Sequence, residues 1–140
     1  MKIEINYEQL AKTAIDAKEM SYSPYSNFRV GAALLGKSGK VYTGCNIESA
    51  AYSPTNCAER TAIFKAVSEG EREFLAIAVA GSPKDSEVDY CYPCGVCRQV
   101  INEFAGEDLV VVVVKSRDEY RVHSFWELLP YGFGVNDLMS

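Results

Sequence analysis

Two cysteine motifs place the strongest constraint on how this chain can fold. The first is Cys57-Ala58-Glu59-Arg60, and the second is Pro93-Cys94-Gly95-Val96-Cys97. Together they offer three thiolates for one zinc ion, with a carboxylate two residues after the first thiol. Three protein ligands leave one coordination position open, where the metal can lower the pKa of a water molecule beside a proton acceptor. The sequence therefore predicts a catalytic zinc site.

Composition predicts one folded domain. The 140 residues are 48% hydrophobic and 24% charged, which is enough apolar material for one core and typical of a globular domain. No internal repeat or Gly/Ser-rich linker divides the sequence. We expect a single domain that spans residues 1–140.

Charge and hydropathy exclude several kinds of partner. The net charge of −5 argues against a nucleic-acid surface, because phosphate backbones are bound through basic patches. The longest wholly apolar run, Leu109 to Val114, is too short to span a bilayer, and no basic region followed by an apolar stretch opens the chain. Five cysteines, an odd number, suit metal binding in a reducing compartment better than a secreted disulfide framework. We expect a cytoplasmic protein with a small-molecule substrate and no membrane partner.

The hydrophobic pattern of the first third of the chain predicts a helix followed by a hairpin. Asn6 suits the N-cap of the helix, and Ser21-Tyr22-Ser23-Pro24 ends it. Two strands, 28–35 and 40–46, are joined through Gly36-Lys37-Ser38-Gly39, whose glycines suit a tight antiparallel turn.

After the hairpin, helices and strands are predicted to alternate. The predicted elements are a helix over 57–67 closed by Gly70, a strand over 74–80, a helix over 95–104, a strand over 109–115 and a short helix over 125–129. Such alternation is typical of parallel strands with helices packed on them. We therefore expect an α/β domain of three layers, α/β/α, whose mixed sheet starts with two antiparallel strands and continues with parallel ones.

Both cysteine motifs fall at predicted helix N-termini. Backbone N–H groups and the partial positive charge at such ends stabilise thiolates, and right-handed crossovers place the two ends along one edge of the sheet. Cys57, Cys94 and Cys97 can therefore converge. Three thiolates on Zn²⁺ leave a net charge of about −1, so Arg60 is a candidate to donate to the sulfurs and withdraw charge.

Three other interpretations of these motifs stay open. Asn56 and Glu59 have capping-box spacing, in which Glu59 would only reach back to a backbone N–H. Cys91 could complete a closed structural zinc site with the three other thiols. The Cys91-x-x-Cys94-x-x-Cys97 spacing also opens the bacterial iron–sulfur signature, although Ile101 stands where that signature needs its fourth cysteine.

The single histidine is predicted to be a surface residue. His123 precedes Ser124, which forms a capping-box pattern with Glu127. We do not expect it to bind the metal.

A wider set of motifs resembles a known family. The segments are Tyr25 to Leu34, Gly44 to Glu48, Cys57 to Ala62, Pro93 to Gln99, and Glu127 to Pro130 with Phe133. In this order and approximate spacing they resemble the small zinc-dependent cytidine deaminases with three cysteine ligands, over essentially the whole chain. The general signature of a zinc ligand, Glu and Pro-Cys-x-x-Cys is shared by zinc deaminases.

The resemblance implies a fold and a reaction. The fold is three-layered with a five-stranded mixed sheet. Cys57, Cys94 and Cys97 would bind one zinc ion per subunit. Glu59 would carry protons from the zinc-bound water to N3 and then to the departing amine, while attack at C4 converts cytidine or 2′-deoxycytidine to the uridine product and ammonia.

The resemblance also implies contacts to the nucleoside. Phe28 would pack against the pyrimidine, Ala58 would supply backbone contacts to the base, and Asn46 with Glu48 would bind the ribose. Small members of the family are homotetramers with shared active sites, which Tyr52 and Phe133 would complete in a neighbouring subunit.

Three residues depart from the family pattern. Cys91 and Tyr92 precede Pro93 where a small polar residue is expected beside the proline, and Arg29 follows Phe28 where proline or lysine is common. Two alternatives to a cytidine deaminase remain: a deaminase of a modified cytosine nucleoside, and a zinc-stabilised interaction module in which Glu59 is only a helix cap.

Overall fold

The helices and strands follow the predicted order, with two additions near the C-terminus. The structure is a computed structural model that describes residues 3–84, 86 and 89–139. The elements are α1 Tyr7–Lys18, β1 Phe28–Gly36, β2 Val41–Cys45, α2 Ala58–Ser68, β3 Phe74–Pro83, α3 Gly95–Phe104, β4 Ala105–Val114, β5 Tyr120–Ser124, α4 Phe125–Leu128 and α5 Val135–Met139. The sequence analysis did not predict β5 or α5. Within the described residues, no helix has the length and apolar character needed to cross a membrane.

The five strands form one mixed sheet in the order β2-β1-β3-β4-β5. The β1–β2 hairpin is antiparallel, as predicted, and β3 pairs parallel to β4. Strand β1 also pairs antiparallel with β3, so β2, β3 and β4 all run in the same direction. The expectation that only parallel strands follow the hairpin is wrong for β5, which pairs antiparallel with β4. The reason is the short turn between them, because a parallel neighbour needs a much longer crossover.

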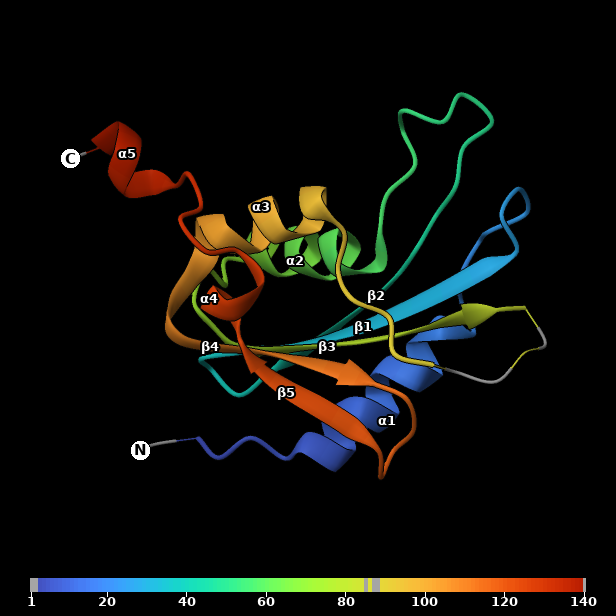
Figure 1. Cartoon of the computed structure of the whole chain (residues 1–140), viewed down its shortest axis with the longest axis horizontal. Coiled ribbons are helices and arrows are strands. Elements are labelled where there is room, and N and C mark those ends of the chain that lie inside the picture. Colours follow the sequence, from blue (N-terminus) through green and yellow to red (C-terminus); the bar gives the residue numbers. More distant parts are fainter. Residues whose placement is uncertain (1–2, 85, 87–88, 140) are drawn as a thin grey trace.

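Helices cover both faces of the sheet (Figure 1). Helix α1 lies on one face, where Ala11 and Ala14 pack on the central strands. The strand residues on this face occupy alternate positions and are small: Ala33, Ala76, Ala78, Ala80, Val112 and Val114. The other face carries α2, α3 and α4 over the intervening positions, with larger side chains: Leu34, Ile63, Ile77, Val79, Ile101, Val111, Val113 and Phe125. This alternation between two buried faces explains the nearly continuous apolar runs of β3 and β4. The three-layer prediction is confirmed.

Helix α2 approaches the sheet very closely at Gly44 of β2. A Cβ atom at this position would lie 2.3 Å from the carbonyl oxygen of Ala58, the first residue of the helix. Only glycine permits that approach without a shift of the backbone. Gly44 therefore sets the position of the turn that follows Cys57.

Candidate metal centre and active site

The two cysteine motifs meet at the carboxyl end of β3. Cys57 is the N-cap of α2 and Cys94 is the N-cap of α3, and neither side chain forms a capping hydrogen bond. Cys97 lies in the first turn of α3 and is fully buried. Figure 1 shows α2 and α3 together on one face of the sheet. The local folding of both motifs leaves their sulfurs free and directs them to one point.

The three sulfurs, here called the cysteine cluster, have the spacing of a tetrahedral metal site. The Sγ atoms of Cys57, Cys94 and Cys97 all lie within 4.8 Å of one another. Zn–S bonds of about 2.3 Å at tetrahedral angles would separate two sulfurs by about 3.8 Å. The distance between the Sγ atoms of Cys57 and Cys94 is 3.8 Å. The donor set therefore fits Zn²⁺, a metal that favours thiolates in tetrahedral geometry.

The cysteine cluster favours ionised sulfur at Cys57. A hydrogen bond from Cys97, together with the Arg60 guanidinium, lowers the pKa of Cys57 to about 5. The same hydrogen bond and burial raise the pKa of Cys97, because its proton is shared with the neighbouring sulfur. A bound cation displaces the remaining protons, since metal ligands must be deprotonated.

Arg60 lies where the excess negative charge of three thiolates would be. Its Nη2 donates to the Sγ of Cys57 at 3.2 Å. Its Nε is buried without a hydrogen-bond partner. A guanidinium held in this way, next to a sulfur, offsets ligand charge and orients the thiolate.

Glu59 is buried in the first turn of α2, with only 3% of its surface exposed. Burial raises the pKa of its carboxyl group to about 7, and the nearby Cys57 sulfur adds to the effect. The capping-box interpretation of Asn56 and Glu59 is wrong, because the N-cap is Cys57 and the Asn56 amide instead donates to the Thr61 hydroxyl at 3.2 Å. A buried carboxyl group that is not a helix cap needs another role.

Cys91 stands outside the cysteine cluster. Its sulfur packs against Gly81 of β3, where an added Cβ would lie 2.9 Å from the Cys91 Sγ and 3.1 Å from Cε1 of Phe28. Burial, with a smaller contribution from the negative charge of Glu59, raises the pKa of the Cys91 thiol to about 11. The described residues therefore gather three thiols and not four, which disfavours both the closed zinc site and the iron–sulfur interpretation.

Phe28 and Asn46 are joined through the backbone of β1. The Asn46 Nδ2 donates to the carbonyl of Phe28 at 2.8 Å, and its Oδ1 accepts from the N–H of Val30 at 2.9 Å. The Phe28 side chain itself is 37% exposed. Asn46 is therefore a strut that holds the start of β1 in place, a role that the sequence analysis did not predict.

The segment that carries Asn46 and Glu48 runs beside Cys57. Two hydrogen bonds of 2.9 Å join the backbones of Ile47 and Asn56. The Glu48 carboxylate accepts from the N–H of Tyr25 at 2.9 Å and from the side chain of Ser26, and these hydrogen bonds, chiefly the one from Ser26, hold its pKa below the usual value. A cavity of about 390 Å³ opens between these residues: Tyr25, Ser26, Glu48, Ser49, Tyr52 and Thr55.

Tyr52 and Phe133 project from the surface. Tyr52 is 76% exposed and Phe133 58% exposed. The carbonyl of Phe133 accepts hydrogen bonds of 2.8 Å from the side chains of Gln99 and Asn102. Two side chains of α3, the helix capped by Cys94, thus hold the backbone of Phe133 in place while its ring stays exposed.

Arg98 has a structural role that the sequence analysis did not predict. Arg98 donates through Nε to the carbonyl of Pro93 at 2.8 Å and through Nη1 to the carbonyl of Leu128 at 2.7 Å. The only sequence feature that pointed to Arg98 is its position directly after Cys97. Arg98 links the residue before Cys94 to the end of α4.

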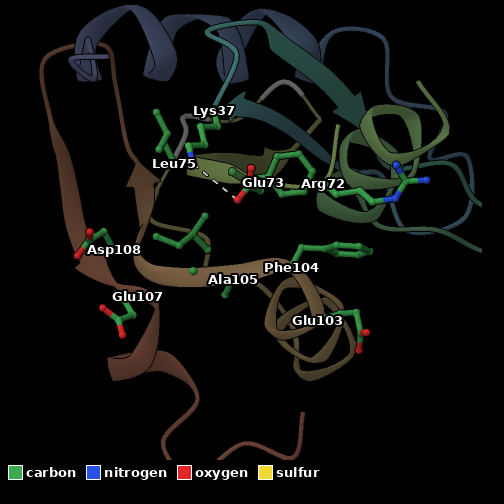
Figure 2. A pocket seen from close by; sticks show the side chains of 12 residues that line it. Lys37, Arg72, Glu73, Leu75, Glu103, Phe104, Ala105, Glu107 and Asp108 are labelled. Carbon is green, nitrogen blue, oxygen red and sulfur yellow. Dashed lines mark ion pairs between the residues drawn. The ribbon is translucent and has the colours of Figure 1, made fainter. Parts of the chain in front are cut away.

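A second cavity lies at the other end of the sheet, at the amino ends of β3 and β4. Its volume is about 430 Å³, and its lining includes the Lys37–Glu73 ion pair, at 3.7 Å. Figure 2 shows the charged side chains of Arg72, Glu103 and Asp108 spread around it and not gathered at one point. No grouping of metal-binding side chains was found there among the described residues.

Comparison with known proteins agrees with this geometry. Residues 4–113 match the profile of the cytidine and deoxycytidylate deaminase zinc-binding region. The chain is 47% identical over 134 residues to a cytidine deaminase of Sporosarcina psychrophila, an alignment that covers 96% of each chain. It is 47% identical over 131 residues to one of Halalkalibacterium halodurans, covering 94% of this chain and 96% of that protein. The crystal structure of a cytidine deaminase from Burkholderia pseudomallei superposes with a TM-score of 0.82 at 45% identity, covering 92% of this chain and all of the other. This protein therefore belongs to the cytidine and deoxycytidylate deaminase family.

Proposed function

We propose that the protein is a zinc-dependent hydrolase that converts cytidine and 2′-deoxycytidine to uridine and 2′-deoxyuridine, with release of ammonia. One observation carries the proposal. A carboxyl group with 3% exposure, that of Glu59, lies beside three sulfurs with the spacing of a tetrahedral site that has one open position. A structural zinc site does not need a buried carboxyl group next to it.

The chain supplies a proton carrier for this reaction. Zinc held by Cys57, Cys94 and Cys97 would supply Lewis acidity and lower the pKa of water. The Glu59 carboxylate would take a proton from the attacking water and give it to N3 of the pyrimidine. It would then pass the second proton to the departing amine, so that water and cytidine become uridine and ammonia. Arg60 would hold the Cys57 thiolate throughout.

Four residues near the cysteine cluster would bind the nucleoside. Phe28 would pack on the base and the backbone of Ala58 would hydrogen-bond it, while Asn46 and Glu48 would bind the ribose hydroxyls. The Glu48 carboxylate supports a neutral nucleoside as substrate, because it would repel the phosphate of a nucleotide.

We also propose a cytoplasmic homotetramer whose active sites are shared. Each subunit would be a single domain of residues 1–140. The exposure of Tyr52 and Phe133 supports their placement in the pockets of neighbouring subunits. Light scattering would report the mass of the assembly.

The first experiment measures ultraviolet absorbance and ammonia when the zinc-loaded protein is mixed with cytidine. We expect both signals to show turnover, and we expect a chelator-treated sample to lose it. If the protein contains zinc but gives neither signal, the proposal fails. A set of modified cytosine nucleosides, measured in the same way, would then test the alternative substrate class.

A further inference from the structure

The segment that leads into Cys94 contacts β5, the edge strand of the sheet. It begins at Asp89, which forms an isolated bridge with Gly81, and ends at Pro93. Its side chains alternate in direction, as in a strand. Cys91 faces Gly81 and Phe28, while the two tyrosines on either side of it contact residues of β5.

Tyr92 makes the contact nearest to the metal ligands. Its hydroxyl lies 3.1 Å from Nε2 of His123, and the two ring centroids are 5.4 Å apart. Tyr90 makes a parallel contact, with the Arg121 guanidinium 3.8 Å from its ring centroid. The prediction that His123 is a surface residue was incomplete, since its side chain is only 23% exposed and is engaged at both ring nitrogens.

A carboxylate orients the imidazole. Nδ1 of His123 lies 3.3 Å from Oε2 of Glu127, and Oε1 of Glu127 accepts the N–H of Ser124 at 3.1 Å. With its Nδ1–H donated to the carboxylate, His123 presents Nε2 as an acceptor for the Tyr92 hydroxyl. The start of α4 therefore sets the direction in which His123 meets the segment.

Three features of the surrounding backbone set the position of Cys94. They are the buried Pro93 before it, the N–H of Arg98, which donates to its carbonyl at 2.9 Å, and the segment that Tyr92 joins to β5. Cys94 is exposed, and as the N-cap of α3 it forms no side-chain capping bond. Its backbone follows directly from Pro93, whose carbonyl Arg98 ties to Leu128 at the end of α4. Tyr92 and Arg98 thus fasten both sides of one peptide segment to the β5–α4 unit.

We infer that Tyr92 and His123 are positioning residues for the metal centre: their contact fixes the segment that places Cys94 in the cluster and Cys91 against Phe28. This inference rests on the proposed role of Cys94 as a zinc ligand.

The test compares zinc release from four variants of the full-length zinc-loaded protein. Tyr92→Phe and His123→Leu remove the contact, His123→Gln retains a polar group at the same place, and Tyr120→Phe removes a hydroxyl elsewhere on β5. We expect the first two to release zinc to a chromophoric chelator about three- to tenfold faster, since partners outside the ligand shell tune metal affinity. His123→Gln should recover part of the loss, and Tyr120→Phe should match the unaltered protein.

Two further readouts separate positioning from general stability. Replacement of zinc by Co²⁺ gives visible absorption bands that depend on ligand geometry, and we expect them to shift in Tyr92→Phe and His123→Leu only. The double variant should release zinc no faster than the worse single variant, because both changes break one contact.

An unchanged rate of zinc release and an unchanged cobalt spectrum in both Tyr92→Phe and His123→Leu would overturn the inference. If Tyr92→Phe fails to fold, the comparison of His123→Leu with His123→Gln decides the question. These readouts need no substrate. A protein that binds zinc but does not turn over cytidine would therefore contradict the proposed function and still test this inference.

Discussion

The two ends of the parallel pair β3–β4 differ in what they offer. The amino end holds a cavity of about 430 Å³, bordered by exposed charged side chains (Figure 2). The carboxyl end holds three converging sulfurs, a buried carboxyl group and a guanidinium. Two helix N-termini, those of α2 and α3, supply the sulfurs at this second end. In open α/β sheets ligands bind at the carboxyl ends of strands, and the converging side chains of this protein follow that rule.

The two ends also differ in how far their charged and ionisable side chains are buried. At the amino end, Lys37 and Glu73 form a pair whose side chains are 64% and 74% exposed, and water screens such charges. At the carboxyl end, burial changes the ionisation of Glu59 and Cys91. A glutamate is therefore exposed to solvent at one end of the sheet and buried at the other.

The largest expected effect comes from exchanging a carboxylate at each end. Glu59→Gln should lower kcat for cytidine by about 10²- to 10⁴-fold while zinc content stays unchanged, because proton transfer in both directions runs through this group. Glu73→Gln, at the amino end, should leave kcat unchanged. Near-normal turnover in Glu59→Gln would remove that residue from the mechanism and with it the functional contrast between the two ends.

A pair of glycines sharpens the comparison at the level of packing. Gly44→Ala should cost about 1–3 kcal/mol of unfolding free energy and lower zinc content, because its Cβ would push against Ala58 beside the first metal ligand. Gly106 lines the amino-end cavity, and an added Cβ there would meet nothing within 4 Å. Gly106→Ala should therefore change the free energy of unfolding by less than about 0.5 kcal/mol. Urea denaturation and metal analysis measure both. Equal costs would show that α2 does not depend on the close approach at Gly44.

The smallest effect is expected from the fourth thiol at the carboxyl end. Cys91→Ser should keep one zinc ion per chain, with kcat within about twofold of normal, because this sulfur lies outside the cluster and a hydroxyl is of similar size. Loss of zinc from this variant would restore the closed four-cysteine site.

The strongest periodic patterns predicted most of the fold. Helix α3 has the predicted bounds, and the N-cap of α1 at Asn6 is confirmed by a hydrogen bond of 3.1 Å from the N–H of Gln9. Strand β5 escaped assignment because it is short and half-exposed at an edge, so few of its residues carry a burial signal. Helix α5 has no buried residue and therefore no apolar stripe to reveal it.

The sequence predicted the members of the site better than their partners. Cysteine spacing was enough to expect the cluster, because ligand chemistry restricts which residues can serve. It could not show that Arg98 joins Pro93 to Leu128, or that Tyr92 meets His123, since both contacts join segments about 30 residues apart. Long-range side-chain contacts of this kind depend on how the completed layers pack.

The strut formed by Asn46 gives one side chain two duties. Its amide ties together the backbone around Phe28 and Val30 before any nucleoside arrives. A substitution at this position would remove these two hydrogen bonds together with the ribose contact proposed for Asn46. The order of the first residues of β1 and the proposed recognition of the sugar therefore depend on the same side chain, so the two cannot change independently.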